Sequence, residues 1–218
     1  MTNGETRILL DCGLPFKKLE KLLEFKLPDA VLVTHEHKDH AKAVKDFIKH
    51  GVDVYMTKGT ADALQLEENH RLNLIVDGES WLIGEVMAYA FRVVHDAKDP
   101  VNFLINDGED EVVYYTDLGR IPHKKFVIPT KILIETNFSE DELKKTSLDE
   151  KQKKRIFENH LSVGKALKIL SQSQFSELKE VYLIHVSKRH GDAEKFKLKM
   201  QNFLKELGHE NIKVFVTE

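Results

Sequence analysis

The segment Thr34–His40 contains the residues of this chain that are best suited to metal chemistry. It places three imidazoles and the Asp39 carboxylate within six positions, directly after an apolar strand. Alternate spacing lets His35 and His37 face one pocket, while Asp39 and His40 lie one tight turn further on and can reach a second ion. Nitrogen and carboxylate ligands without thiolate suit Zn, Mn or Fe, and a loop at a strand end leaves coordination positions open for water. The pattern predicts a two-metal hydrolytic site, and the alternative is a solvated polar loop before a helix.

The composition sets the bounds for this interpretation. A chain of 218 residues is long enough for one large domain, and we expect a single domain over residues 1–218. A formal charge of -3 and a pI near 6.4 argue against an architectural nucleic-acid binder, so a polyanion would be held by local patches and by the metals. The single Cys12 excludes an internal disulfide. Without a signal peptide or a membrane-length apolar run, we expect a cytoplasmic protein with no membrane partner.

Predicted strands and helices alternate along the chain without a linker or an internal repeat. Strands are predicted at 7–11, 31–33, 52–56, 81–95, 101–105, 111–115, 131–134, 181–185 and 212–216, and helices at 16–25, 41–50, 139–158, 161–170 and 193–207. With strands in the middle and at both ends, and helices between them, the pattern favours an α/β protein in which two sheets pack together and helices cover the outside.

Six short motifs occur in the order found in metallo-β-lactamase-fold hydrolases. They are His35-x-His37-x-Asp39-His40, Val94-His95-Asp96, Thr116-Asp117-Leu118-Gly119, Glu135-x-Asn137, His160-Leu161-Ser162 and Leu183-Ile184-His185-Val186-Ser187. From about Ile8 to its C-terminus the chain resembles most the small YycJ-like nuclease branch, and more distantly the tRNA-processing RNase Z enzymes. The resemblance implies a four-layer αββα sandwich. Related chains begin with an extra strand pair, so we expect this first pair to be missing and the exposed sheet edge to favour a homo-oligomer.

The resemblance also implies the ligands of two divalent metal ions, with Zn favoured and Mn or Fe as alternatives. The expected ligands are His35, His37 and His95 for one ion, Asp39, His40 and His185 for the other, and Asp117 as the bridge. A bridging carboxylate keeps two cations about 3.5 to 4 Å apart, and the water that they share loses its proton near neutral pH. The residues alone also allow His95 to be a core histidine and Asp117 to be a turn or cap residue.

His160 and Glu135 form a second pair with an implied role. In the family that the chain resembles, a histidine at this place donates a proton to the leaving oxygen or contacts the scissile phosphate, and the glutamate orients its ring. The leaving group of a nucleic acid is an alkoxide, which needs such help. The alternative is that His160 only precedes a helix that Ser162 caps. We expect His160, Glu135 and Asp39 to be the catalytic residues.

Three further features leave their interpretation open. Asp11 ends a strand beside the expected metal loop and either fixes a ligand histidine or is a structural aspartate. The basic segment 151–155, with Lys144 and Lys145, is either a solvated helix face or a surface that positions phosphates. The remaining histidines lack partners at ligand spacing and are expected to be surface or structural residues: His50, His70, His123, His190 and His209.

These observations predict a two-metal phosphodiesterase that acts on nucleic acid, with DNA favoured and an exonuclease as the favoured type. A small-molecule hydrolase of a thioester, lactone or cyclic phosphodiester is the alternative within the same chemistry. A non-catalytic metal-stabilised binding protein is the alternative from another class, and it would require the loss of a motif residue. A β-lactamase is disfavoured because the zinc-site cysteine of several such enzymes has no counterpart here.

Overall fold

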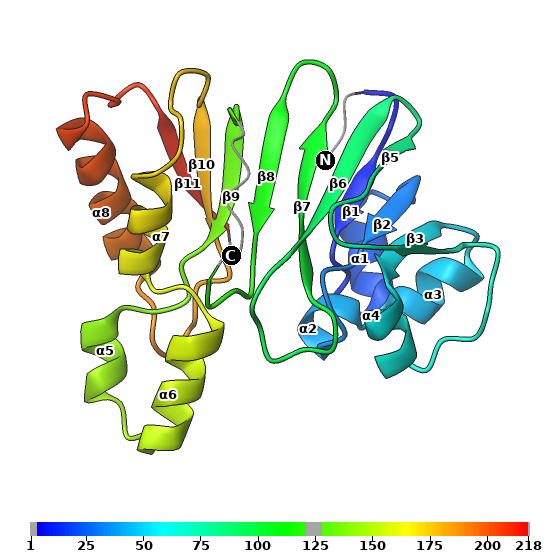
Figure 1. The fold of residues 1–218 in the computed structure, drawn as a ribbon, viewed down its shortest axis with the longest axis horizontal. Coiled ribbons are helices and arrows are strands. Elements are labelled where there is room, and N and C mark those ends of the chain that lie inside the picture. The colour runs from blue at the N-terminus through cyan, green and yellow to red at the C-terminus, as the bar shows by residue number, and fades with distance from the viewer. Residues whose placement is uncertain (1–3, 121–127, 218) are drawn as a thin grey trace. The chain divides into compact units, whose positions relative to one another are not determined.

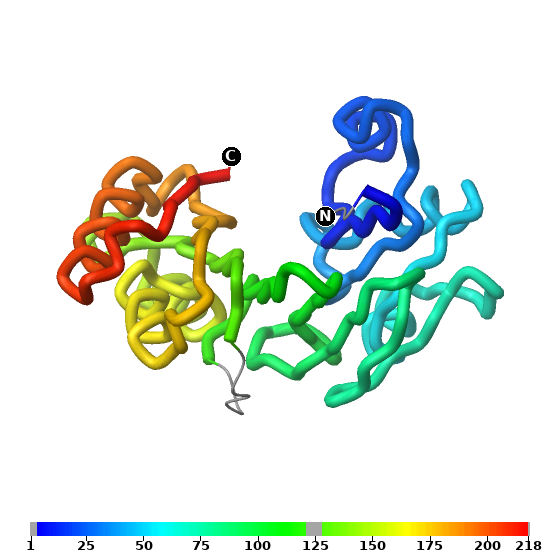
Figure 2. The backbone as a smooth tube through the Cα atoms, turned by 90° about the horizontal axis from the view of Figure 1, so that it is seen from above, coloured from blue at the N-terminus to red at the C-terminus, as the bar shows by residue number. Residues whose placement is uncertain are grey.

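The computed structural model describes residues 4–120 and 128–217, which form two compact units (Figure 1, Figure 2). The first unit contains the described residues up to Arg92 together with Asp96–Phe103. The second contains Val93–His95 and the described residues from Leu104 onward. Among the residues described, no helix combines the length and the apolar character needed to span a bilayer.

The first unit is built on a parallel sheet with the order β1-β2-β3-β4. Its strands are β1 (Ile8–Leu10), β2 (Ala30–Leu32), β3 (Asp53–Thr57) and β4 (Leu72–Ile75), and its helices are α1 (Phe16–Leu22), α2 (Lys38–Ala41), α3 (Val44–Lys49) and α4 (Lys58–Ala63). All three residues of β2 are buried, which is typical of a parallel strand covered on both faces. Val31, Phe47 and Met56 belong to one hydrophobic core that fixes the position of the loop after β2.

The strand predicted over residues 81–95 is two strands, β5 (Ser80–Ile83) and β6 (Val86–Arg92), paired as an antiparallel hairpin. Gly84 lies in the turn with a φ of 57°, a conformation that glycine adopts without steric cost. The prediction of one strand was wrong because apolar residues continue on both sides of this turn. His95 consequently lies beyond the end of β6 and outside the strand.

The second unit contains four parallel strands in the order β11-β10-β9-β8. They are β8 (Glu111–Tyr115), β9 (Lys131–Glu135), β10 (Glu180–Ile184) and β11 (Lys213–Val216), and β7 (Val101–Asn106) contributes its residues 104–106. The helices of this unit are α5 (Glu140–Lys145), α6 (Glu150–Asn159), α7 (Val163–Leu170) and α8 (Ala193–Glu206). Helix α7 packs against β9, and α8 packs against β10 and β11, so both lie beside these strands in Figure 1.

The helical stretch predicted over residues 139–158 is divided into α5 and α6, because each helix has its own N-terminal cap. The Ser139 side chain accepts a hydrogen bond from the backbone N–H of Glu142. The Asp149 side chain accepts one from the N–H of Gln152, and the Gln152 side-chain oxygen accepts one from the N–H of Asp149. An N-cap satisfies backbone N–H groups at the start of a helix that have no partner within the helix. Two N-caps in this stretch therefore favour two separate helices. Helix α6 ends at Asn159 and His160 is its C-cap, which places this histidine in the connection to α7.

Candidate metal centre

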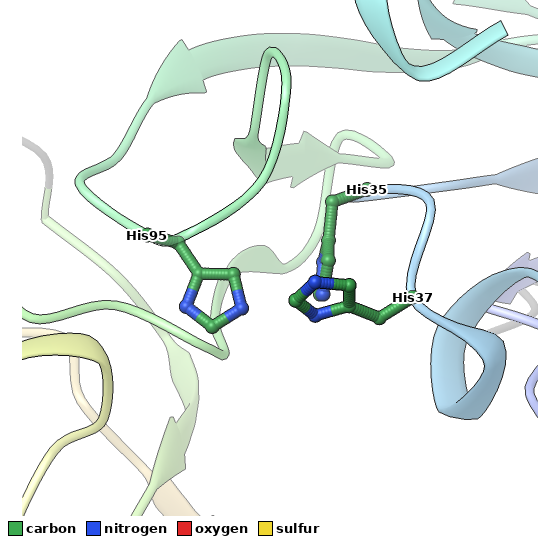
Figure 3. Close-up of side chains that lie close together, drawn as sticks. All are labelled: His35, His37 and His95. Carbon is green, nitrogen blue, oxygen red and sulfur yellow. The ribbon is translucent and has the colours of Figure 1, made fainter. Parts of the chain in front are cut away.

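In the first unit, the loop that follows β2 brings three of the expected metal ligands together. The ring centroids of His35 and His37 lie 4.6 Å apart, and those of His35 and His40 lie 4.3 Å apart. Figure 3 shows His35 and His37 rising from this loop. His37 is the N-cap of α2, so the first turn of the helix carries His40 back toward the other two rings. The spacing predicted from the sequence therefore produces a cluster of imidazoles.

Asp11 and Thr34 hold the inner nitrogens of two of these imidazoles. The Nδ1 atom of His40 lies 2.7 Å from Oδ2 of Asp11, and Nδ1 of His35 lies 3.0 Å from Oγ1 of Thr34. The N–H and the hydroxyl of Thr34 both donate to the Asp11 carboxylate. A hydrogen bond at Nδ1 fixes the ring and leaves Nε2 as the metal-binding atom. Of the two interpretations of Asp11, this geometry supports the one in which it orients a ligand histidine.

A close backbone approach positions Asp39, the fourth expected ligand of this unit. A Cβ atom on Gly13 would lie 1.6 Å from the carbonyl oxygen of Asp39, so only glycine allows this packing. Oδ2 of Asp39 lies 3.9 Å from Nε2 of His40, and the Asp39 side chain is 68% exposed. The carboxylate can therefore meet an ion and solvent at the same time.

Asp11→Asn is expected to weaken metal binding about 10- to 100-fold, the usual effect of removing a carboxylate that orients a ligand histidine. Asn tolerates the left-handed conformation found at Asp11, where φ is 57°, so the backbone can stay as it is. Competition with a chromophoric chelator measures the affinity, and Asp53→Asn is the control because Asp53 pairs with Arg71. Equal affinities of Asp11→Asn and the unmodified chain would contradict this role.

In the second unit, four expected functional residues converge at the carboxyl ends of parallel strands. Asp117, Glu135, His160 and His185 each offer a ligand atom, and these atoms all lie within 4.8 Å of one another. Asp117 follows β8, Glu135 ends β9 and His185 follows β10. Asp117 and His185 have φ values of 46° and 53°, which non-glycine residues rarely adopt. Such backbone strain is concentrated at functional sites, because the surrounding structure must hold it in place.

Glu135 is the centre of this cluster. It is fully buried, and its Oε1 lies 2.7 Å from Nδ1 of His160 and 2.9 Å from Nδ1 of His185. Its second oxygen accepts the backbone N–H of Leu161 at 3.0 Å. Oδ1 of Asp117 lies 2.9 Å from the same Nδ1 of His160. The expected contact of Glu135 with His160 is present, and the carboxylate also holds the expected ligand His185.

Charge and burial act in opposite directions on this cluster in the metal-free chain. Burial alone would lower the pKa of His160, but hydrogen bonds to Asp117 and Glu135 outweigh it and raise the pKa to about 9. Burial and the charge of Asp117 would raise the pKa of Glu135, but the hydrogen bonds from His160 and His185 lower it. The cluster is therefore an ionised carboxylate beside a protonated imidazole at neutral pH.

His95 also belongs to the second unit and approaches its cluster. Its Nδ1 lies 3.0 Å from the carbonyl oxygen of Asn159, and its ring meets that of His160 edge to face at a centroid distance of 5.6 Å. The side chain is partly exposed and is labelled in Figure 3. With Nδ1 held by a carbonyl, Nε2 is the ring atom that would bind a metal, as for His35 and His40.

The structure thus distributes the expected site residues over both units. They lie at strand ends, in the connections after strands, in α2 and between α6 and α7. The first unit contains His35, His37, Asp39 and His40, and the second contains His95, Asp117, Glu135, His160 and His185. Histidine nitrogens and carboxylate oxygens fit Zn, Mn or Fe, and four of the expected ligand histidines have Nδ1 already held: His35, His40, His95 and His185.

The other histidines have structural or surface positions where they are described. His50 bonds through Nδ1 to the carbonyl of Asp46, and His209 stacks on Phe175. His123 lies outside the described residues. Sequence reasoning missed the hydrogen bonds by which Thr34 and the Asn159 carbonyl hold two of the expected ligand histidines, His35 and His95. Only the position of Thr34, directly before the first motif, could have indicated such a role.

This combination of fold and side chains defines a protein of the β-lactamase superfamily. The chain matches the family described as "Beta-lactamase superfamily domain" over residues 6–186, and it belongs to this family. The expected α/β metallo-β-lactamase fold is confirmed, and with it the membership of a metal-dependent hydrolase family. The histidine and carboxylate clusters agree with such a hydrolase.

The individual relatives share only a modest fraction of their residues with this chain. The chain is 27% identical over 226 residues to Exodeoxyribonuclease WalJ of Streptococcus pneumoniae, covering 96% of this chain and 80% of that protein. It is 26% identical over 223 residues to Exodeoxyribonuclease YycJ of Bacillus anthracis, covering 94% and 83% of the two chains. The crystal structure of the metallo-β-lactamase fold protein YhfI from Bacillus subtilis matches with a TM-score of 0.74 at 17% identity, over 100% of this chain and 87% of that one.

Proposed function

We propose that the protein is a two-metal phosphodiesterase that cleaves nucleic acid, with DNA as the favoured substrate and exonucleolytic cleavage as the favoured type. In this proposal the ligands are those expected from the sequence: His35, His37, His95, Asp39, His40, His185 and the bridging Asp117. The observation that carries the proposal is the bond between His160 and Glu135, because a carboxylate here holds an imidazole in addition to the expected ligand histidines. The names of the two exodeoxyribonuclease relatives support the choice of nucleic acid.

Two bound cations would activate a water molecule and neutralise charge on the phosphate. The chain's own groups would supply the proton for the departing alkoxide. Glu135 accepts the hydrogen bond from Nδ1 of His160, so the ring is held with its Nε2–H available to a leaving oxygen. The Leu161 N–H keeps the second oxygen of Glu135 in place. Asp39, whose side chain is 68% exposed, would hold its ion at a position that solvent can reach.

The pair of His160 and Glu135 also bears on the choice between a nuclease and a small-molecule hydrolase. Thiolates and the alkoxide of a strained lactone leave with little help, whereas the alkoxide of a DNA phosphodiester requires a proton. A thioester, lactone or cyclic phosphodiester hydrolase remains the second candidate, because the same metal ligands serve all these substrates. A non-catalytic binding protein would not need a histidine held by a carboxylate outside the proposed ligand set.

The experiment that tests the proposal is a substrate screen with purified, metal-reconstituted protein. End-labelled single- and double-stranded DNA and RNA would be compared with a chromogenic phosphodiester, a thioester and a lactone. We expect DNA to be shortened from an end and the esters to be poor substrates. Hydrolysis of the lactone or thioester with every nucleic acid intact would establish the second candidate instead.

The basic face of α6 provides a prediction about substrate binding. Lys151 and Arg155 are exposed, and no residue of α6 is buried, so the helix can present its charges to a phosphate backbone. Lys151→Ala and Arg155→Ala are each expected to raise KM for DNA. Each should also reduce the slope of log Kd against log salt by about 0.7 to 0.9, because one phosphate is no longer neutralised. Turnover of a small phosphodiester should not change.

Lys17→Ala, in α1 of the first unit, is the matched control for these two variants because Lys17 is also an exposed helical lysine. Salt slopes that are identical for Lys151→Ala, Arg155→Ala, Lys17→Ala and the unmodified chain would make the basic face of α6 a solvated helix surface only.

A further inference from the structure

We propose that the groove between α8 and β11 binds an unpaired nucleic-acid strand, with Phe215 and Tyr182 as the surface on which its bases stack. The inference rests on the proposed function and specifies the form of its substrate. It concerns residues that none of the six sequence motifs includes.

The groove has a volume of about 480 Å³ and is lined by α8, β11 and the turn between them. Lys197, Lys205 and Lys213 line it, and Glu210 is its only acidic residue among those described. Gln201 and Asn202 add side-chain amides, which can bond to phosphate or to base edges. In a chain with a formal charge of -3, this local excess of positive charge indicates a negatively charged partner.

An aromatic pair lies at the edge of the groove. Phe215 lines it, and Phe215 is in register with Tyr182 of the neighbouring strand β10. The two rings are stacked with a centroid distance of 4.9 Å and an interplanar angle of 21°. Phe215 is 37% exposed, whereas Val214 beside it is buried in the core. Stacked aromatic rings next to a lysine-lined groove are the combination by which proteins hold single strands without a sequence preference.

Strand β10 connects the aromatic pair to the expected catalytic residues within the second unit. Tyr182 is in register with Leu133, and Ile184 with Glu135, so Tyr182 lies on the same face of the sheet as Glu135. His185 follows Tyr182 by three residues, which corresponds to roughly 10 Å along a strand. A strand of nucleic acid that stacks on Phe215 and Tyr182 is therefore directed along β10 toward His160 and His185.

Charge favours a nucleic acid over a second copy of the chain as the occupant. Two copies joined by this groove through a two-fold axis would bring their lysines together, and like charges across an interface are unfavourable. A duplex is also a poorer fit than a single strand, because its bases are already stacked on one another and cannot cover Phe215 and Tyr182.

The test is the binding of a short fluorescent oligothymidylate to the full chain, measured by anisotropy in the presence of a chelator so that no cleavage occurs. Phe215→Leu keeps an apolar side chain but removes the ring, and we expect about tenfold weaker binding. Tyr182→Leu should behave similarly, whereas Tyr182→Phe should bind like the unmodified chain. Binding of a blunt duplex should change much less. Phe25→Leu, at a 70% exposed phenylalanine of the first unit, is the control.

The lysines are tested by salt dependence. The triple variant Lys197→Ala, Lys205→Ala, Lys213→Ala should have a shallower salt slope, by roughly 2 if each lysine neutralises one phosphate at about 0.7 each. The control is Lys17→Ala, Lys45→Ala, Lys49→Ala, which changes the net charge equally at exposed lysines of the first unit. Circular dichroism of each variant confirms that it is folded.

Three outcomes would overturn the proposal: unchanged binding in Phe215→Leu and Tyr182→Leu, equal weakening for the single strand and the duplex, or a dimer in sedimentation that Phe215→Leu dissociates. Because the assay requires no cleavage, it is separate from the proposed activity. A chain that hydrolyses only small esters but still binds oligothymidylate through Phe215 would contradict the nuclease and leave the groove assignment in place.

Discussion

Asp117→Asn is expected to lower the metal content from two ions per chain to less than one and to reduce hydrolysis to the level of the metal-free protein. As the proposed bridge, Asp117 would be a ligand of both ions, so both sites should weaken together. Asp117 is buried, with a φ of 46°, and asparagine has nearly the same shape and tolerates this conformation. The reduced metal content can therefore be assigned to the carboxylate charge and not to unfolding.

Elemental analysis after gel filtration measures the metal content of each variant. Asp110→Asn is the control in the same unit, because Asp110 pairs with Lys131 at 2.5 Å and lies in the turn before β8. Its replacement should affect stability and leave two ions bound. A single tightly held ion that Asp117→Asn leaves unchanged would contradict the binuclear assignment.

His160→Ala is expected to lower the rate of DNA cleavage by about 10² to 10⁴ while both metal ions remain bound, because a general acid usually contributes this much. The control is a substrate with p-nitrophenolate as the leaving group, which scarcely needs a proton. The variant should recover most of its rate on this substrate. An equal decrease on both substrates, with metal content intact, would make His160 a substrate-binding or structural residue.

The pH dependence provides a second measure of the same role. A general acid is active in its protonated form, so a raised pKa preserves activity through neutral pH, and activity falls as pH rises through that pKa. In the metal-free chain the carboxylates raise the pKa of His160 to about 9. Bound cations oppose the carboxylates, so the loaded enzyme should lose activity at a lower pH than this value. His160→Ala should lack this alkaline limb.

The histidine-rich loop after β2 could be predicted from the sequence because its information is local. An apolar strand followed by His35, His37 and His40 fixes which side chains share one loop, and the structure places their rings together. The strands 111–115 and 131–134 and the helix at 193–207 were also predicted within a residue of their observed ends. Continuous apolar runs and a regular amphipathic pattern identify such elements without tertiary information.

Features that depend on long-range contacts could not be predicted in the same way. The bond from Glu135 to His185 joins residues 50 positions apart, and it requires β9 and β10 to be neighbours in the sheet. The packing of Gly119 also depends on a contact between distant segments, since a Cβ atom there would lie 1.7 Å from the carbonyl oxygen of Glu158. This close approach brings the segment of Asp117 to the end of α6, beside His160. No periodicity in the sequence shows that these segments meet.

The short elements of the first unit were missed for a local reason. Helix α4 and strand β4 have only 6 and 4 residues, which is too short for a periodic apolar pattern. Helix α4 is fixed by its cap, since Thr57 accepts a hydrogen bond from the Thr60 N–H and donates one to the carbonyl of Asp99. The partner in the second bond lies 42 residues away, so the tertiary structure determines this helix.

The most direct test of the account is a metal titration of DNA cleavage. Metal-free protein at a concentration far above the metal Kd would receive increasing Zn or Mn, and the rate of shortening of end-labelled DNA would be followed at each step. We expect the rate to rise to a break at two equivalents per chain, to vanish with a chelator and to return when metal is added again. A break at one equivalent, or intact DNA at saturating metal while a lactone or thioester is hydrolysed, would contradict a two-metal nuclease.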